Sequence, residues 1–209
     1  MGGETPQRTP GSERLPTLAE FYLEQSRKAL AKAQANQARN EKVIPAEAQK
    51  HVGSGAWSES ANKPPYPPGT NKCNLFVYEV LNAAGTPVPM KIRFSWRNFG
   101  NVSYPPLAGQ WADPDVTIPG WEVVQNPLPG DVAAQKMSYS DASGHVGIVT
   151  GPGKTVSASS DTGTIVENNW GFRADQQGEV VFRRYVGVPE TKTQPYQERK
   201  WPTRGRNAP

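Results

Sequence analysis

Residues 71–84 read NKCNLFVYEVLNAA, and this stretch decides the fold because its apolar side chains recur at helical spacing. They fall at i, i+3, i+4, i+7, i+8 and i+11 on Cys73, Phe76, Val77, Val80, Leu81 and Ala84. Such spacing predicts one buried face of an α-helix, and Gly85 is typical of the residue that closes one. Cys73, the single cysteine of the chain, is therefore expected in the first turn, on the inward face.

A second pattern, with a period of two residues, begins later in the chain. Residues 145–150 place His145, Gly147 and Val149 on one face of a strand and Val146 and Ile148 on the other. Further strands are expected over 131–134, 155–159, 164–168 and 179–186. The fold class is therefore predicted to be α+β, with the helix that carries Cys73 packed on an antiparallel sheet of about five strands.

The remaining sequence predicts flanking segments. Thr17 and Glu20 have the spacing of a capping box, so we expect a helix to begin there and to end at Val43-Ile44-Pro45. Its apolar face thins out after Leu30, which predicts a solvated arm or a partner-binding helix in the second half. We therefore divide the chain into a polar N-terminal segment (1–55), one folded domain (56–189) and a flexible basic tail (190–209).

Composition and charge exclude several classes of function. One cysteine and two distant histidines support neither a disulfide framework nor a metal site, and no cofactor is expected. The net charge of +4 divides into +2 for residues 1–55, −1 for 56–189 and +3 for 190–209, so no basic groove for nucleic acid is predicted. No apolar run approaches the roughly 20 residues that span a bilayer. A monomer without a membrane span is expected.

Cys73 and His145 are the candidate catalytic pair. A thiolate is the reactive form of cysteine, and a helix N-terminus and a neighbouring imidazolium both lower a thiol pKa. The order of the two residues, nucleophile on a helix start and base on a later strand, is the arrangement of a papain-like thiol hydrolase. The N–H of Cys73, aided by the side chain of Asn71 or Asn74, would form an oxyanion hole.

The aromatic region from residue 90 to residue 128 has two interpretations. Its rings, broken by prolines, are typical of a loop-rich subdomain that packs on the core. Alternatively, some of these rings, foremost Trp96 and Trp111, wall a substrate groove. The other histidine, His51, lies in a polar, glycine-flanked stretch and is not assigned a catalytic role.

Three short motifs resemble a known group of enzymes. Cys73-Asn-Leu-Phe-Val77, Pro129-Gly-Asp-Val132 and Gly144-His-Val-Gly-Ile-Val149 resemble, in order and spacing, the bacterial cell-wall cysteine hydrolases of the NlpC type and the related CHAP amidases. The resemblance covers roughly residues 60–187. It implies a papain-like fold, with Cys73 as nucleophile and His145 as general base.

The resemblance also implies a third polar residue that orients the histidine ring. In the NlpC-like register this position is Ser157, on the strand after the histidine strand. In the CHAP-like register it is Glu167, in the run Glu167-Asn-Asn-Trp170, and Asn169 and Trp170 would then contact substrate. Adjacency of strands favours Ser157, whereas a carboxylate holds an imidazolium better than a hydroxyl does. Both alternatives stay open.

One position departs from the NlpC pattern. Those enzymes typically carry an aspartate before the cysteine, which helps to recognise the free amine of a trimmed peptide stem, and a small residue after it. This chain has Lys72 and Asn74 there. A lysine implies cross-linked or untrimmed stems, whose carboxylates suit a cation.

The resemblance implies a hydrolase that cleaves an amide bond in the peptide stem or cross-link of bacterial peptidoglycan. The first twenty residues carry charges and prolines instead of the apolar block of a secretory signal. We therefore expect an antibacterial effector made in the cytoplasm and delivered to the periplasm of a target cell by another route, with an immunity protein as partner; a phage lysin fits nearly as well. Two alternatives are a thiol acyltransferase or deamidase acting on a protein or lipid, and a non-catalytic wall-binding or partner-binding module.

Overall fold

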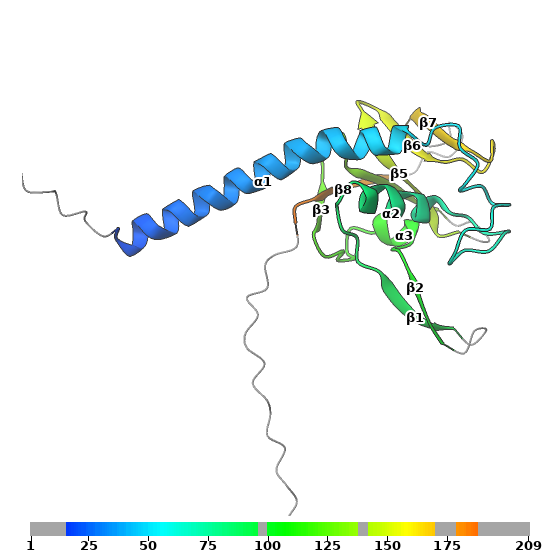
Figure 1. Cartoon of the computed structure of the whole chain (residues 1–209), viewed down its shortest axis with the longest axis horizontal. Helices are drawn as coiled ribbons and strands as arrows, with labels where there is room; N and C mark the ends of the chain where they lie inside the picture. Colours follow the sequence, from blue (N-terminus) through cyan, green and yellow to red (C-terminus); the bar gives the residue numbers. More distant parts are fainter. Residues whose placement is uncertain (1–15, 96–99, 138–141, 170–178, 188–209) are drawn as a thin grey trace, which may run out of the picture.

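The fold is an antiparallel sheet with helices packed on it (Figure 1), in a computed structural model that describes residues 16–95, 100–137, 142–169 and 179–187. Six strands form the main sheet in the order β3-β8-β4-β5-β6-β7. Their bounds are β3 Trp121–Val124, β4 Val132–Lys136, β5 Gly144–Gly151, β6 Lys154–Ala158, β7 Ile165–Asn169 and β8 Val180–Tyr185. All the pairs in this order are antiparallel. The predicted α+β class, with a helix on an antiparallel sheet, is confirmed.

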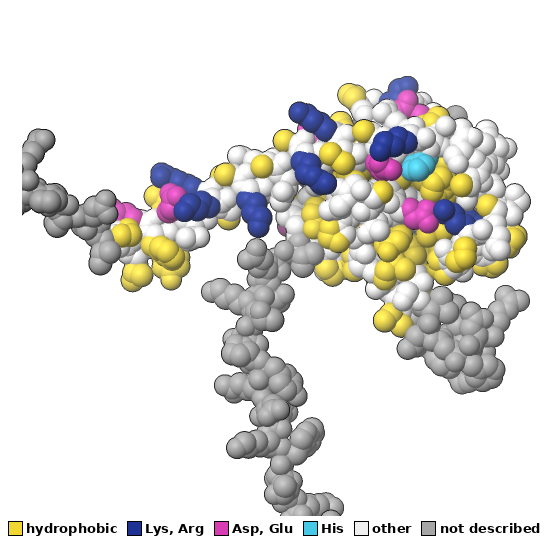
Figure 2. Space-filling view, in the orientation of Figure 1, with side chains coloured by type: hydrophobic (Ala, Val, Ile, Leu, Met, Phe, Trp, Pro, Cys, Tyr) yellow, Lys and Arg dark blue, Asp and Glu magenta, His cyan; other side chains and the backbone are white. Residues whose placement is uncertain are grey.

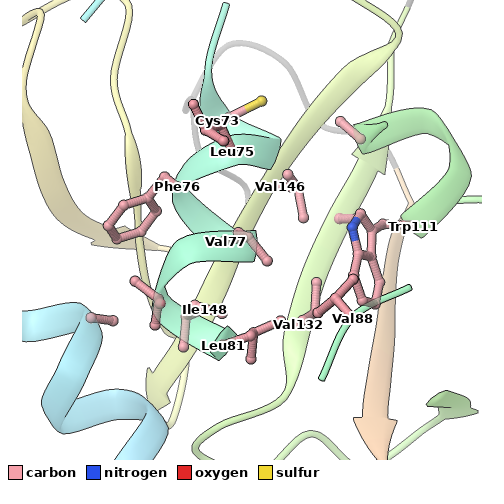
Figure 3. Close-up of a cluster of buried hydrophobic side chains, with 14 of the residues drawn as sticks. Cys73, Leu75, Phe76, Val77, Leu81, Val88, Trp111, Val132, Val146 and Ile148 are labelled. Carbon is pink, nitrogen blue, oxygen red and sulfur yellow. The ribbon is translucent and has the colours of Figure 1, made fainter. Parts of the chain in front are cut away.

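Helix α2 (Cys73–Ala83) covers one face of this sheet. The paired residues Ala134 and Val146 of β4 and β5 lie on that face, and so do Val132 and Ile148. They pack with Phe76, Val77 and Leu81 of α2, as Figure 3 shows. Burying a side chain of this size stabilises the fold by roughly 1.5–3 kcal/mol, so this layer fixes the position of the helix start.

The helix over the N-terminal segment is longer than predicted. α1 (Leu18–Gln49) begins at the Thr17–Glu20 capping box, as predicted, but continues through Pro45. A proline inside a helix costs about 3 kcal/mol. Here Ile44 and Ala48, on either side of Pro45, are both 0% exposed and belong to the core, which offsets that cost. The prediction that the helix ends at Pro45 is therefore wrong.

The stretch of α1 just after Leu30 is solvated as predicted, since residues 31–36 are exposed, but the end of the helix is not. There the Arg39 guanidinium donates to the Ala84 carbonyl at 2.6 Å, and Asn40 is buried. The first half projects from the domain with Leu18, Phe21 and Tyr22 exposed (Figures 1 and 2). The end of the helix is fixed by its four buried residues, Asn40, Ile44, Pro45 and Ala48.

The region from residue 90 to residue 128 contains more regular structure than predicted. β1 (Lys91–Ser95) and β2 (Gly100–Tyr104) form a separate hairpin, α3 (Ala108–Trp111) is a single turn, and β3 joins the main sheet. The described chain thus has six strands in one sheet and two in another instead of about five. Within the residues that the structure describes, no helix is long and apolar enough to span a bilayer.

Candidate functional site

Cys73 is the first residue of α2, and it lies at the surface of a pocket. The pocket has a volume of about 480 Å³. It is lined by Tyr66, Thr70, Asn71, Cys73, Asn74, Leu107, Ala108, Ala142, Ser143 and Gly144. Cys73 is only 7% exposed, so little of it meets solvent although it lines the pocket. Figure 3 shows its sulfur pointing away from the apolar layer beneath α2.

The thiol sulfur accepts a hydrogen bond from the backbone N–H of Val146, the residue that follows His145. Val149 exchanges its hydrogen bonds with the β4 side, donating to Asp131 and accepting from Gly130, both at 2.8 Å. Amide directions alternate along an antiparallel strand, so the Val146 amide points toward β6. The register of β5 with β6 begins only at Ile148. The sulfur thus occupies the place where a β6 carbonyl would otherwise accept that hydrogen bond.

Burial raises the pKa of the Cys73 thiol to about 11. The backbone amides of Val146, Asn74 and Cys73 act in the opposite direction, because they stabilise the thiolate. The helix start therefore has the predicted effect, but loss of hydration is larger. The prediction of a lowered pKa is wrong for this state of the protein: the thiol is protonated at neutral pH.

His145 is half-buried near the start of β5, one residue after Gly144. Its Cα partner across the β4–β5 ladder is Gln135. Because side chains alternate along a strand, His145 and Gly147 lie on the face opposite the Val146–Ile148 layer. The fold thus brings the strand that carries His145 against the sulfur of Cys73, while the imidazole projects from the other face of the sheet.

The two candidates for the third catalytic residue lie in different places. Ser157 of β6 is 0% exposed and lies on the face of His145 and Gly147, because the adjacent Val156 belongs to the core face. Its hydroxyl makes no hydrogen bond to any residue that the structure describes. Glu167 of β7 pairs with Val156, so it lies on the other face and two strands from β5. Its carboxylate accepts the Thr150 hydroxyl at 2.8 Å. This placement favours Ser157.

The predicted substrate-binding residues next to Cys73 are divided. Asn71 and Asn74 line the pocket. Lys72 does not, because it is 2% exposed and its ammonium donates to the carbonyls of Ser58, Glu59 and Thr70 at 2.9–3.1 Å. These bonds fix the loop that precedes α2, and they turn the charge of Lys72 away from the pocket.

The predicted aromatic groove is not found at Trp111. This side chain is 1% exposed and packs edge-to-face on Trp121 with ring centroids 5.0 Å apart, so it is a core residue. The alternative interpretation, core packing, holds for it. Asn169 is an exposed residue at the end of β7. Trp96 and Trp170 lie outside the described residues.

Tyr66, which the sequence did not single out, is a wall of the pocket. The Asn74 side-chain amide donates to the Tyr66 hydroxyl at 2.7 Å. Burial raises the pKa of this phenol, so it keeps its proton and can donate to a bound ligand. In the sequence, Tyr66 is a single aromatic residue among prolines before the cysteine. An isolated residue forms no periodic pattern, so its position in the fold could not be predicted.

The other histidine, His51, belongs to a structural cluster and does not line the pocket. Its ring packs on Trp57 with centroids 4.9 Å apart, and its Nε2 lies 3.6 Å from the Glu47 carboxylate. Among the described side chains no group of three or more His, Cys, Asp and Glu could hold a metal ion.

Comparison with protein-family models, curated proteins and solved structures returned no match for this chain. The resemblance to cell-wall hydrolases therefore depends on the motifs alone.

Proposed function

We propose that the protein is a papain-like cysteine hydrolase that cleaves an amide bond in the peptide part of bacterial peptidoglycan. The observation that carries this proposal is the position of the lone thiol. It lies at a helix start, opens on a pocket of about 480 Å³, and bonds to the strand that bears His145. A cysteine with only a packing role needs neither a pocket nor a sheet amide.

The thiol pKa determines how the first step proceeds. With a pKa of about 11, a preformed thiolate is rare at neutral pH, so a base must remove the proton as the sulfur attacks. We assign this role to His145, which requires its imidazole to reach the sulfur past the start of β5, where the register with β6 has not yet begun. The Cys73 sulfur bonds to the substrate carbonyl carbon, and its proton passes to the imidazole. The imidazolium gives that proton to the amide nitrogen as the C–N bond breaks, which leaves a thioester.

Water completes the cycle. His145 removes one proton from the attacking water, whose oxygen bonds to the thioester carbon. The C–S bond then breaks, and the proton returns to the sulfur of Cys73. Both tetrahedral intermediates carry an oxyanion, and the backbone amides of Cys73 and Asn74 already converge on the thiol. The Tyr66 hydroxyl, across the same pocket, is a third donor for that charge or for the substrate.

The walls of the pocket support a substrate that is uncharged next to the scissile bond. The lining residues in the described part of the chain are neutral: one wall offers Thr70, Asn71, Asn74 and Tyr66, and the other offers Leu107 and Ala108. Lys72 is committed to three carbonyls. Its ammonium is therefore not available to attract the carboxylates of untrimmed stems.

Digestion of purified sacculi tests the proposal. Wild type, Cys73→Ala and the control His51→Gln are incubated with sacculi, and the soluble fragments are identified by mass spectrometry. We expect wild type and the control to release the same new stem peptides and Cys73→Ala to release none. Identical fragments from Cys73→Ala would end the proposal. A mass change of one unit on a side-chain amide, or a transferred acyl group, would instead identify a deamidase or acyltransferase.

We also propose that the protein acts outside the cell that makes it, in the periplasm of a target bacterium, and that the producer holds an immunity protein. The support is chemical: a wall hydrolase endangers its own host. Expression of the chain with and without an added periplasmic signal tests this point, and lysis confined to the periplasmic form is expected.

A further inference from the structure

A row of polar residues crosses the sheet on the face opposite α2. Alternation along each strand places Gln135 of β4, His145 of β5 and Ser157 of β6 on this face, because their neighbours Ala134, Val146 and Val156 all belong to the core face. Gln135 and Ser157 are each 0% exposed. A buried glutamine is rare in a sheet, since its amide must be hydrogen-bonded to offset the loss of hydration.

Gln135 lies directly across from His145. The two are Cα partners in the β4–β5 register, and the Cβ atoms of such a pair are about 4.5–5.5 Å apart. The local backbone fixes this register. Gly144, at φ +147°, approaches the carbonyl of Gln135 so closely that a Cβ atom would overlap it. The glycine thus allows β5 to begin tightly against β4, and it holds His145 opposite Gln135.

Ser157 is less well placed to hold the imidazole. Ser157 lies on β6, and the register of β6 with β5 begins only at Ile148, so Ser157 is at best a diagonal neighbour of His145. Diagonal neighbours in a sheet are about 7–8 Å apart. A serine hydroxyl is attached directly to Cβ, which limits its reach; among the described residues, neither that of Ser157 nor the Oε1 atom of Gln135 has a hydrogen-bond partner in this state. The amide of glutamine lies two carbons beyond Cβ, so it reaches across to an opposite ring. Glu167 is engaged with Thr150 on the other face.

We propose that Gln135 is the positioning residue of His145, with its side-chain carbonyl accepting an N–H of the imidazolium that forms during turnover. This hydrogen bond selects the ring nitrogen that stays available as the base toward Cys73, since a ring nitrogen that donates cannot also accept. The catalytic part of this inference depends on the proposed function. The proposed hydrogen bond between Gln135 and the ring does not.

The test follows the His145 ring itself by NMR on the full chain labelled with ¹⁵N-histidine. Gln135→Met removes the acceptor at similar length, and Gln135→Glu replaces it with an anion. We expect the titration midpoint of the His145 ring to fall in Gln135→Met and to rise in Gln135→Glu, with a changed tautomer ratio in both. The control Gln49→Met, on α1, should leave the ring signals unchanged.

Peptide release from sacculi gives the second readout. A ring misplaced by about 1 Å costs roughly 10²-fold in rate, so we expect about that loss of kcat in Gln135→Met and partial recovery in Gln135→Glu. If the His145 titration and tautomer are the same in wild type and in the folded variants, the inference is overturned. Should Gln135→Met not fold, an unshifted midpoint in Gln135→Glu overturns it equally. If the ring signals change in the variants but even the wild type releases no peptides, the positioning of His145 by Gln135 stands and the hydrolase proposal is refuted.

Discussion

The two ends of β5 differ in how completely the sheet surrounds them. From Ile148 onward the register joins the strand to β6, while Ile148 also pairs with Val132 of β4 and Val149 bonds to Asp131 and Gly130 just before β4. Thr150 bonds to Glu167 across the sheet. At the start of the strand, from Gly144 to Gly147, the register joins it to β4, and the Val146 amide meets the thiol of Cys73 instead of a β6 carbonyl. The paired end serves stability, and the half-paired end supplies the backbone amide that bonds to the Cys73 thiol.

The largest expected effect comes from removing the thiol at the half-paired end. Cys73→Ala should lower peptide release from sacculi by about 10⁴-fold or more, the loss typical of a deleted nucleophile. Its thermal midpoint should stay close to that of wild type, since a small side chain at a pocket wall is removed. The measurement is fragment release against enzyme concentration. Release at the wild-type rate would remove Cys73 from the mechanism.

A pair of glycine variants compares the two ends of β5 directly. Gly144→Ala forces a Cβ atom into the Gln135 carbonyl at φ +147°, whereas at Gly151 a Cβ atom meets nothing within 4 Å. We expect Gly144→Ala to lower the free energy of unfolding by about 1–3 kcal/mol and to reduce activity, because strain of this kind displaces His145. Gly151→Ala should differ from wild type by less than about 0.5 kcal/mol. Urea unfolding measures both. Equal losses of unfolding free energy in Gly144→Ala and Gly151→Ala would contradict the expected difference between the two ends of β5.

The buried thiol predicts how stability depends on pH. An unfolded cysteine titrates near pH 8.5, and Cys73 titrates at about 11 when folded. Below about pH 8.5 both states hold the proton and this group adds no pH dependence. Between about 8.5 and 11 the unfolded chain loses its proton first, so the free energy of unfolding falls, by up to about 3 kcal/mol.

The matched control for this titration is Cys73→Ala, because the remaining groups titrate alike in both proteins. We expect the difference in stability between wild type and variant to fall over that pH range. Alkylation of Cys73 by iodoacetamide should rise about tenfold per pH unit from pH 7 to pH 10. If the stability of wild type and of Cys73→Ala changes with pH in parallel, or if the alkylation rate is already constant at pH 6, burial does not raise the pKa of Cys73.

The smallest effect is expected at the paired end. Glu167→Gln removes an exposed carboxylate that accepts the Thr150 hydroxyl. Such a surface interaction contributes about 0–1 kcal/mol, so stability and peptide release should remain near the wild-type values. Ser157→Ala is the informative companion, since its hydroxyl lies on the face of His145. A large loss of release in Glu167→Gln alone would revive the CHAP-like register.

The parts of the fold that follow one clear period were predicted from sequence. The helical spacing of Phe76, Val77 and Leu81 gave α2 and the inward face, and the alternation around Val146 and Ile148 gave β5 and its core side. In each element one face is buried against the other element, so apolar residues recur with the period of the helix or of the strand and can be recognised in the sequence.

Features that depend on tertiary contacts were missed. Pro45 stays helical because Ile44 and Ala48 are anchored in the core. For Trp111 the sequence left core packing and a groove wall both open, and the contact with Trp121 decides for the core. The thiol pKa was predicted from the helix start, but the surrounding walls determine the loss of hydration. Gln135 could be placed opposite His145 only after the register of β4 and β5 was known.

The most direct test of the central claim is to trap the thioester on Cys73. Wild-type protein is mixed with soluble peptidoglycan peptides, quenched in acid within a turnover, digested and analysed by mass spectrometry. We expect an acyl adduct on the peptide that contains Cys73, a slower appearance of this adduct in His145→Ala, and none in Cys73→Ala. Release of stem peptides without any adduct, at a rate that is equal in Cys73→Ala, would contradict the account.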